Sequence, residues 1–250
     1  MPALSFLRLA LAALAVTLSP SARAAEVKVA AAANFTAPAR DIGALFERVS
    51  GHKVLFSFGA SGLLYAQIAQ AAPFAVFLSA DRERPQQAIA AGLAVAGSRF
   101  TYATGRLALF SIDPAKVTGE ATLKQVRFAK IAIADPAAAP YGAAAVETMQ
   151  KLGVYAAIEG RIVQGVSIAQ TYQFVVTGNA EVGFVALSQI IESTEGSRWI
   201  VPEALHAPIA QDAVLLKIGA TNPAATAFLA FLQGPEAAAV KDRFGYGSGD

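Results

Sequence analysis

Three short segments place hydroxyl or amide side chains where a helix is predicted to begin. The first contains Asn34, the second Ser61 and the third Tyr141, and each follows an apolar stretch that predicts a strand. The stretches of sequence around these segments, residues 30–39, 54–81 and 131–150, contain no lysine or arginine. The N–H groups and the dipole of a helix start attract anions. The pattern therefore predicts a site that holds a fully deprotonated oxyanion through uncharged donors, since it offers few acceptors for a proton.

Each polar residue also has a purely structural alternative. Asn34 or Thr36 can serve only to cap the helix predicted to start near Pro38, and Ser61 can cap the next helix, because capping is the common role of such side chains. A serine-hydrolase nucleophile is not expected at Ser61, because Leu63 occupies the place of the second glycine in the G-x-S-x-G motif.

Two aspartates, Asp81 and Asp135, also end predicted strands. Carboxylate oxygens are ligands for hard cations, so a carboxylate-only cation site stays open. The chain has two histidines and no cysteine, and a histidine-rich or thiolate metal site is therefore not expected.

The elements that would position these residues alternate along the chain. Apolar runs predict strands over residues 27–33, 54–58 and 74–79, with helices between them. The helix over residues 38–49 has the clearest apolar spacing, and Gly51 follows it as a stop signal. Such alternation favours a mainly parallel sheet covered by helices, with ligands bound at the carboxyl ends of the strands.

A second unit of the same kind follows an extended connector. Residues 99–111 form the connector, and strands over residues 197–201 and 213–217 are predicted to return to the first unit. The predicted elements between them are strands over 131–134 and 182–187 and helices over 142–152 and 168–176. The sequence thus predicts two α/β lobes joined by two crossing strands, with a ligand-binding cleft between them.

The first residues have the pattern of a secretory signal peptide. Arg8 precedes an apolar run over residues 9–18, and an A-x-A site follows at Ala22 to Ala24. The apolar run is shorter than the roughly 20 residues that span a bilayer. We expect cleavage after Ala24 and a soluble mature protein.

Removal of this segment changes the charge balance. The chain has 20 basic and 18 acidic residues, and two of the basic ones, Arg8 and Arg23, lie in the segment, which contains no acid. The mature chain would therefore be formally neutral, which argues against nucleic acid as a partner. The hydrophobic content of the full 250-residue chain, 55%, is ample for a large core.

Beyond these local patterns, the chain resembles the periplasmic molybdate-binding proteins of ABC importers along essentially its whole mature length. The resemblance rests on segments such as AAANFT (31–36), FSFGASGLLYAQI (56–68), VFLSAD (76–81) and VGFVALS (182–188), in the order of that family. It implies the type II periplasmic binding protein fold. The expected division is a signal peptide over residues 1–24, lobe 1 over 25–104 and 202–250, and lobe 2 over 105–201.

The resemblance also implies a set of anion-binding positions. Asn34 would bind through its side chain or its amide, with the backbone of Ala33 beside it. Ser61 matches the serine of the second junction. Tyr141 and Ile168 would each contribute a backbone N–H.

One position departs from the family's pattern. Ala186 stands where some relatives have a tyrosine. We hypothesise that the hydroxyl of Tyr141 replaces the donor that is missing there.

The implied function is a receptor that captures molybdate, and also tungstate, and passes it to a membrane permease. The protein would be periplasmic and monomeric, without enzymatic activity or a cofactor. Molybdenum would be bound only as its oxyanion, with no direct ligands to a metal cation. A receptor for another tetrahedral oxyanion, such as sulfate, is the alternative. A secreted enzyme is a more distant one, because the sequence offers no evident nucleophile and base pair.

Overall fold

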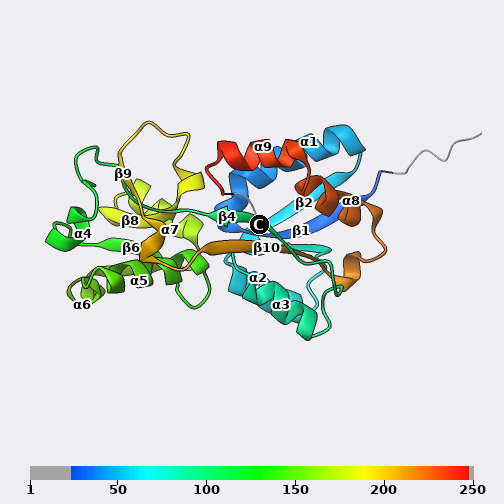
Figure 1. Cartoon of the computed structure of the whole chain (residues 1–250), viewed down its shortest axis with the longest axis horizontal. Helices are drawn as coiled ribbons and strands as arrows, with labels where there is room; N and C mark the ends of the chain where they lie inside the picture. Colours follow the sequence, from blue (N-terminus) through cyan, green and yellow to red (C-terminus); the bar gives the residue numbers. More distant parts are fainter. Residues whose placement is uncertain (1–23, 248–250) are drawn as a thin grey trace, which may run out of the picture.

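The computed structural model describes residues 24–247, in which strands and helices alternate along the chain (Figure 1). The predicted signal peptide lies outside the described residues except for Ala24, so it stays a prediction. The strands are β1 (Glu26–Ala32), β2 (Lys53–Gly59), β3 (Val76–Leu78), β4 (Phe100–Gly105), β5 (Leu107–Ser111), β6 (Ile131–Ala134), β7 (Ile162–Gly165), β8 (Val182–Ala186), β9 (Ser197–Ile200) and β10 (Ile209–Leu215).

Within the described range these strands form two five-stranded sheets. Their orders are β2-β1-β3-β10-β4 and β7-β6-β8-β5-β9. In each sheet the first three strands run parallel, and the last two pair antiparallel with their neighbours. We call the part built on the first sheet lobe 1 and the part built on the second lobe 2; they lie at the right and the left of Figure 1. The predicted architecture of two α/β lobes is confirmed.

The chain crosses between the lobes twice. It passes from β4 to β5 through Arg106 alone, and it returns from β9 to β10 through residues 201–208. β4 and β10 are neighbours in the first sheet and lie side by side across the middle of Figure 1. The expectation that residues 197–201 return to lobe 1 is wrong, because β9 pairs with β5 in the second sheet. The residue pattern of such a short edge strand shows that it is extended but does not specify its partner.

Helices cover both sheets, and their ends follow local signals. α1 ends where Gly51 adopts a left-handed conformation with φ 70°, and its buried face includes Ile42 and Phe46. The α-helices are α1 (Thr36–Ser50), α2 (Ser61–Ala69), α3 (Glu83–Ala90), α4 (Ala121–Gln125), α5 (Pro140–Lys151), α6 (Tyr155–Ile158), α7 (Ile168–Val176), α8 (Pro223–Leu232) and α9 (Pro235–Arg243). Short 3-10 turns are η1 (Ala33–Phe35), η2 (Glu159–Arg161), η3 (Leu187–Gln189), η4 (Glu203–Leu205) and η5 (Lys217–Gly219).

The apolar cores show that the two lobes are in close contact. Lobe 1 has a core of its own around β1, α1 and α8, including Val29, Phe46 and Phe228. The core of lobe 2 includes Leu109 and Phe184, and it continues into alanines of lobe 1. Those alanines are Ala32, Ala33, Ala60 and Ala80. The facing ends of the lobes therefore share one packed interior.

The strand register places the predicted junctions at common edges. The pairing of β1 with β2 ends at Ala32 opposite Gly59, and the pairing of β6 with β7 ends at Ala134 opposite Gly165. Because these pairs are parallel, the chain leaves both strands of each pair at the same edge of the sheet. This brings the starts of α2, α5 and α7 to the space between the lobes.

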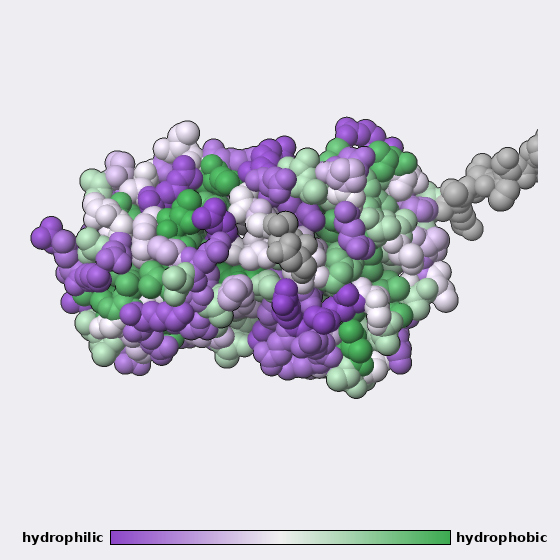
Figure 2. Space-filling model, in the orientation of Figure 1, coloured by the Kyte–Doolittle hydropathy of each residue, from purple (hydrophilic) through white to green (hydrophobic). Residues whose placement is uncertain are grey.

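The face shown in Figure 2 mixes hydrophilic and hydrophobic residues, and hydrophilic residues gather over α3 at the lower middle of the view. Among residues 24–247 there is no helix long and apolar enough to cross a membrane.

Candidate functional site

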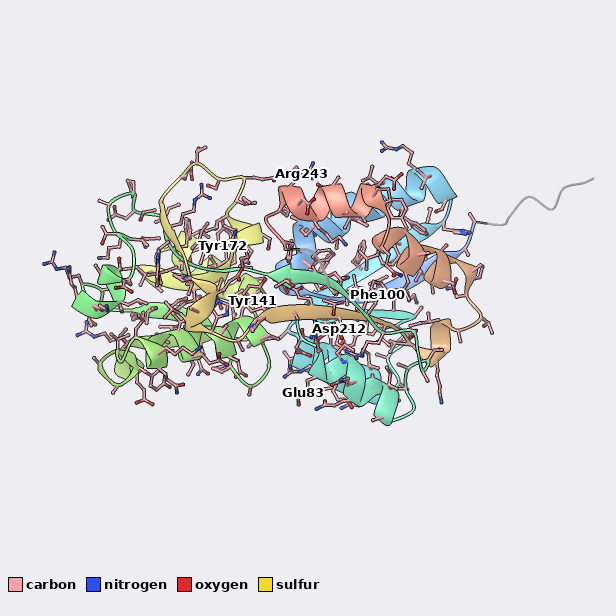
Figure 3. The ribbon with its side chains drawn as sticks, viewed as in Figure 1. Glu83, Phe100, Tyr141, Tyr172, Asp212 and Arg243 are labelled. Carbon is pink, nitrogen blue, oxygen red and sulfur yellow. The ribbon has the colours of Figure 1, made fainter. Side chains whose placement is uncertain are left out.

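All five residues predicted to bind the anion line one small cavity between the lobes. Ala33 and Asn34 come from η1, Ser61 from the start of α2, and Tyr141 and Ile168 from the starts of α5 and α7. Figure 3 shows Tyr141 where the two lobes meet. The cavity has a volume of about 10 Å³, and each of these residues is at most 6% exposed. Pockets for drug-sized organic ligands measure roughly 300–1,000 Å³. The cavity is therefore suited to a small ion.

Three of these residues carry backbone N–H groups that no carbonyl of their own helix can accept. Ser61 and Ile168 are the first residues of α2 and α7, and Tyr141 is the second residue of α5. The first turn of a helix has no preceding carbonyl to pair with. The three helix dipoles also place partial positive charge at these ends. The cavity is thus surrounded by donors and positive dipole ends from both lobes.

The capping alternatives fail at the starts of α1 and α2. The N-cap of α1 is Phe35 and that of α2 is Ala60, and neither helix has a side-chain cap hydrogen bond. The hydroxyl of Thr36 instead donates to the carbonyl oxygen of Ala33 at 2.8 Å.

The hydroxyl of Ser61 is oriented by a hydrogen bond in which it acts as the acceptor, so its proton remains available for donation. Its oxygen accepts a hydrogen bond from the N–H of Ala80 at 2.9 Å. A hydroxyl has one proton to donate and lone pairs that accept. Ser61, which is 1% exposed, therefore keeps its O–H for a partner in the cavity.

Buried hydrogen bonds surround the side chain of Asn34. We name this group the hinge network; its members are Asn34, Tyr102, Tyr141, Ser188, Gln211 and Tyr246, all buried. The amide nitrogen of Asn34 donates to Gln211 Oε1 at 2.9 Å and to Tyr246 Oη at 3.0 Å. The carbonyl oxygen of Asn34 accepts from Ser188 Oγ at 2.8 Å. The network thus ties a cavity residue of lobe 1 to lobe 2, to β10 and to the C-terminal segment.

The hinge network carries no charge at neutral pH. Burial is the main cause that raises the pKa of Tyr102 and Tyr141 well above the ordinary value, and neighbouring tyrosines raise both further. Burial also raises the pKa of Tyr246. All three hydroxyls therefore stay protonated and can act as donors.

The hydroxyl of Tyr141 reaches from lobe 2 into this network. Its oxygen accepts from Gln211 Nε2 at 3.2 Å and lies 3.5 Å from Asn34 Nδ2. The approach requires glycine at position 105, because a Cβ there would lie 2.1 Å from the tyrosine oxygen. Ala186 is fully buried in β8. The idea that Tyr141 replaces a donor missing at Ala186 stays a prediction.

Two further hydrogen bonds join the lobes beside the cavity. The N–H of Gly62 donates to the carbonyl oxygen of Ala138 at 2.9 Å, and Arg84 Nη2 donates to that of Ala137 at 2.7 Å. The lobes are therefore closed in this structure. The fold brings the guanidinium of Arg84 next to Gly62, but an ion pair with Asp81 neutralises its charge.

The two strand-end aspartates have structural partners rather than a shared cation site. Asp81 Oδ1 accepts from the N–H of Arg84 at 2.9 Å, at the start of α3. Asp135 Oδ1 accepts from the N–H of Ala137 at 3.0 Å. In the part of the chain that the structure describes, no group of three or more His, Cys, Asp or Glu residues could hold a metal ion.

Sequence reasoning missed three residues that surround the cavity, Arg84, Gln211 and Tyr246. Gln211 had a detectable signal, because Gln211 and Asp212 interrupt the apolar strand β10 and both are completely buried. Polar side chains in such a position need buried partners. Arg84 and Tyr246 stand in ordinary surroundings in the sequence, and only the fold brings them here.

The arrangement can bind an oxyanion but offers no evident route to bond cleavage. Of the described residues that line the cavity, none is a histidine, an acid, a lysine or an arginine. Ser61 therefore has no general base beside it in the cavity, which a serine nucleophile would need.

Comparisons with known proteins agree with this geometry. A family model described as bacterial extracellular solute-binding protein matches residues 27–247. The chain is 55% identical to the molybdate-binding protein ModA of Rhodobacter capsulatus, over 94% of this chain and 93% of that protein. It is 52% identical to a molybdate-binding protein ModA of Azotobacter vinelandii, over 97% and 98%. The solved periplasmic molybdate-binding protein of Azotobacter vinelandii matches with a TM-score of 0.86 and 38% identity, over 90% of this chain and 100% of that chain. The predicted fold of a two-lobed type II periplasmic binding protein is confirmed.

Proposed function

This chain belongs to the family of bacterial extracellular solute-binding proteins, and from that premise we propose that it captures molybdate between its two lobes. Its family binds solutes rather than transforming them, so we assign it no reaction. The proposal is supported by the relatives that share more than half of its residues over nearly the whole chain, both of which are named for molybdate binding.

One observation carries the proposal beyond the likeness to relatives. A small cavity between the lobes is lined by buried helix starts and a serine hydroxyl, and its lining includes no ionisable side chain except tyrosine. Such a set of donors stabilises an anion that has no proton left to donate. Monohydrogen phosphate is disfavoured, because its proton would need an acceptor.

In this proposal the anion is bound through five positions. Ser61 donates its hydroxyl and its backbone N–H, and Tyr141 and Ile168 donate backbone N–H groups at the starts of α5 and α7. Asn34 and Ala33 complete the site from η1. Helix dipoles offset much of the double negative charge, so no lysine or arginine is required in the cavity.

Selection over sulfate would come from size rather than charge, because both anions are doubly negative at neutral pH. Donors that are spaced for the longer metal–oxygen bonds leave a smaller anion with stretched hydrogen bonds, and several such losses add in free energy. Tungstate has nearly the same size and charge as molybdate, and we propose that it binds as well.

The proposed setting follows from the same likeness. We propose that the protein works in the periplasm as a monomer, after removal of residues 1–24, and that the closed form delivers its anion to the membrane permease of an ABC importer. No further cofactor enters this proposal.

The melting temperature of the mature protein with single anions tests this function. Molybdate at a hundred times its dissociation constant should stabilise the fold by about 2.7 kcal/mol, and tungstate should act similarly. Sulfate and phosphate at the same concentration should have little effect. A shift with sulfate but none with molybdate would overturn the proposal in favour of a sulfate receptor.

A further inference from the structure

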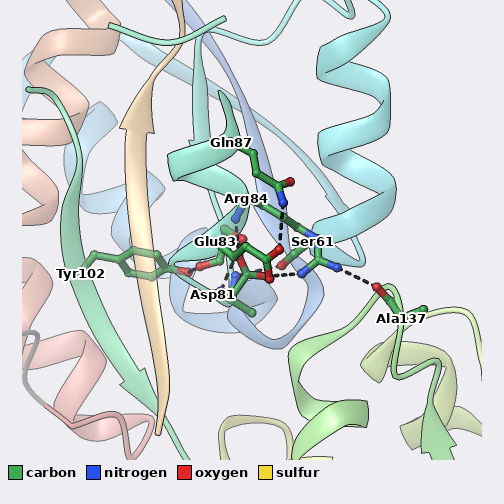
Figure 4. Close-up of polar contacts among 9 residues, drawn as sticks. Ser61, Asp81, Glu83, Arg84, Gln87, Tyr102 and Ala137 are labelled. Atoms are coloured by element: carbon green, nitrogen blue, oxygen red, sulfur yellow. Dashed lines mark hydrogen bonds and ion pairs between the residues drawn. The ribbon is translucent and has the colours of Figure 1, made fainter. Parts of the chain in front are cut away.

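The side chain of Arg84 bridges the two lobes at the edge of the anion cavity (Figure 4). It forms an ion pair with Asp81 of lobe 1, and its Nη2 donates to the carbonyl oxygen of Ala137 in lobe 2 at 2.7 Å. It also covers Gly62, where a Cβ would lie 3.1 Å from Arg84 Nε. The Arg84 side chain as a whole is 18% exposed, whereas its hydrogen bond to Ala137 lies at the exposed surface.

The lobe 1 half of the bridge is held in place before the lobes meet. Asp81 follows β3 and accepts from the N–H of Arg84 through Oδ1, while Oδ2 pairs with the guanidinium of the same residue. The preceding residue, Ala80, donates its N–H to the hydroxyl of Ser61. One short segment therefore orients both Arg84 and a proposed anion ligand.

The lobe 2 half is a loop that its own hydrogen bonds make rigid. Asp135 accepts from the N–H of Ala137 at 3.0 Å through its side chain and from that of Ala139 at 2.8 Å through its carbonyl oxygen. The same loop leads directly into α5, where Tyr141 lines the cavity. The carbonyl oxygens of Ala137 and Ala138 in this loop face lobe 1, and the N–H group of Tyr141, just after the loop, faces the cavity. A movement of the loop would therefore change both the contact with lobe 1 and the position of Tyr141.

We propose that Arg84 is a positioning residue that keeps the closed lobes together and thereby slows the release of the bound anion. We call Asp81, Arg84 and Ala137 the interlobe latch. The proposal rests on the proposed function, because it concerns the release of the same anion. It assigns Arg84 no contact with the anion: the guanidinium acts by holding the loop that carries Tyr141.

Arg82 offers a matched control for charge. It lines the same interlobe groove of about 550 Å³ as Arg84. Its ion-pair partner is Asp212 of its own lobe, at 3.8 Å, and its side chain is 53% exposed. Loss of either arginine weakens the attraction of anions from a distance equally, but only Arg84 joins the lobes.

Stopped-flow kinetics with molybdate separates these two effects. Arg84→Gln should speed anion dissociation by about tenfold, the effect of losing one hydrogen bond to a charged group. Its association rate should match that of Arg82→Gln, which should leave dissociation unchanged. Arg84→Lys should give an intermediate rate, because an ammonium group cannot hold Asp81 and Ala137 in one planar fork. Equal dissociation rates for Arg84→Gln and Arg82→Gln would overturn the proposal.

A second measurement does not depend on the identity of the anion. The chain has no cysteine, so exposed Gln86 on α3 and Gln150 on α5 can be replaced by cysteine and spin-labelled for distance measurement. Without added anion, Arg84→Gln should shift the distances toward longer values relative to Arg82→Gln. Identical distributions in the two variants would also overturn the latch. If the wild-type protein does not respond to molybdate while Arg84→Gln still shows the longer distances, the proposed function is refuted and the latch is supported.

Discussion

The hinge network and the interlobe latch both connect the lobes beside the same cavity, yet they are built from opposite chemistry. In the hinge network, Asn34, Gln211 and the tyrosines are neutral and almost completely buried. In the latch, Arg84 and Asp81 are charged and remain 18% and 16% exposed. The first surrounds the crossing strands, whereas the second joins a helix of lobe 1 to a loop of lobe 2.

This difference indicates a division of roles. A buried neutral network is strongly destabilising when it is only partly satisfied, so it should fix one geometry of the crossing strands. The interlobe contact of the latch is one exposed hydrogen bond from Arg84 to the Ala137 carbonyl, which exchanges with water at a small free-energy difference. It can therefore open and close without unfolding the protein. The four predictions below test this contrast, from the largest expected effect to the smallest.

Asn34→Leu should damage the hinge network most. Gln211 and Tyr246 would each lose a buried hydrogen bond, and the free energy of unfolding should fall by about 3 kcal/mol. Urea unfolding of the anion-free protein measures the change. Asn179→Leu is the control, because Asn179 is exposed and bonds only locally to Thr177. Equal losses in the two variants would mean that the network has no special part in stability.

Ser61→Ala tests a donor that lies between the two regions. We expect anion binding to weaken by about 2 kcal/mol, because a hydrogen bond to a charged partner is lost. Calorimetric titration with molybdate measures this change. Ser79→Ala is the matched control: Ser79, which follows β3, is as buried as Ser61 but does not line the cavity. A variant that binds as tightly as wild type would demote Ser61 to a structural residue.

Tyr141→Phe distinguishes a network role from an anion contact. Removal of the hydroxyl takes an acceptor from Gln211 Nε2, which should lower stability. If the hydroxyl also donates to the anion in place of the donor missing at Ala186, as we hypothesise, binding should weaken by about 1.5 kcal/mol. Titration should be paired with urea unfolding of the anion-free variant. A loss of stability with unchanged affinity would exclude the hydroxyl from the site and would place it wholly in the hinge network.

Glu181→Gln tests a charged contact far from the cavity. The N–H of Lys130 is the largest cause that lowers the pKa of Glu181, with further lowering from the N–H of Ala129 and from Lys116. Because the folded pKa is below the unfolded one, this stabilisation is present above the unfolded pKa and is lost as pH falls through the folded pKa.

Wild type should therefore be slightly more stable than Glu181→Gln at pH 7, and the difference should shrink at acidic pH below the unfolded pKa of about 4.3. Urea unfolding at both pH values measures it. Glu120→Gln, at an exposed helical ion pair with Lys124, is the control. If the stability difference between wild type and Glu181→Gln grew at acidic pH, the hydrogen bonds to Glu181 could not be its cause. A change in anion affinity in Glu181→Gln would show that the contacts of Glu181 are coupled to the cavity between the lobes.

The sequence alone was sufficient to predict those parts of the fold that are determined by residues close together in the chain. The helix of residues 36–50 was visible from its apolar spacing and from Gly51, and the junctions at Ser61 and Tyr141 followed from strand and helix signals a few residues apart. Since parallel strands bring their carboxyl ends to one edge, these local signals were enough to place Asn34 and Ser61 at one edge of the first sheet. Ala33 and Ile168 were expected only from the family resemblance.

The contacts that join distant segments could not be predicted in this way. Asn34 meets Tyr246 across 212 positions, and Arg84 meets Ala137 across 53. Nothing near Tyr246 marks it as a buried partner, since its partners Asn34 and Ser188 lie in distant segments of the chain. The prediction for β9 was wrong for the same reason. Its pairing with β5 depends on how the whole second sheet is arranged and cannot be read from the residues of β9 alone.

The position of β10 also bears on the order in which the molecule assembles. This strand, formed near the end of the chain, separates β3 from β4 in the first sheet. The second sheet needs only residues 107–200. A chain delivered from its N-terminus can therefore complete its middle section first, while its opening section must wait unfinished until residue 215 has arrived.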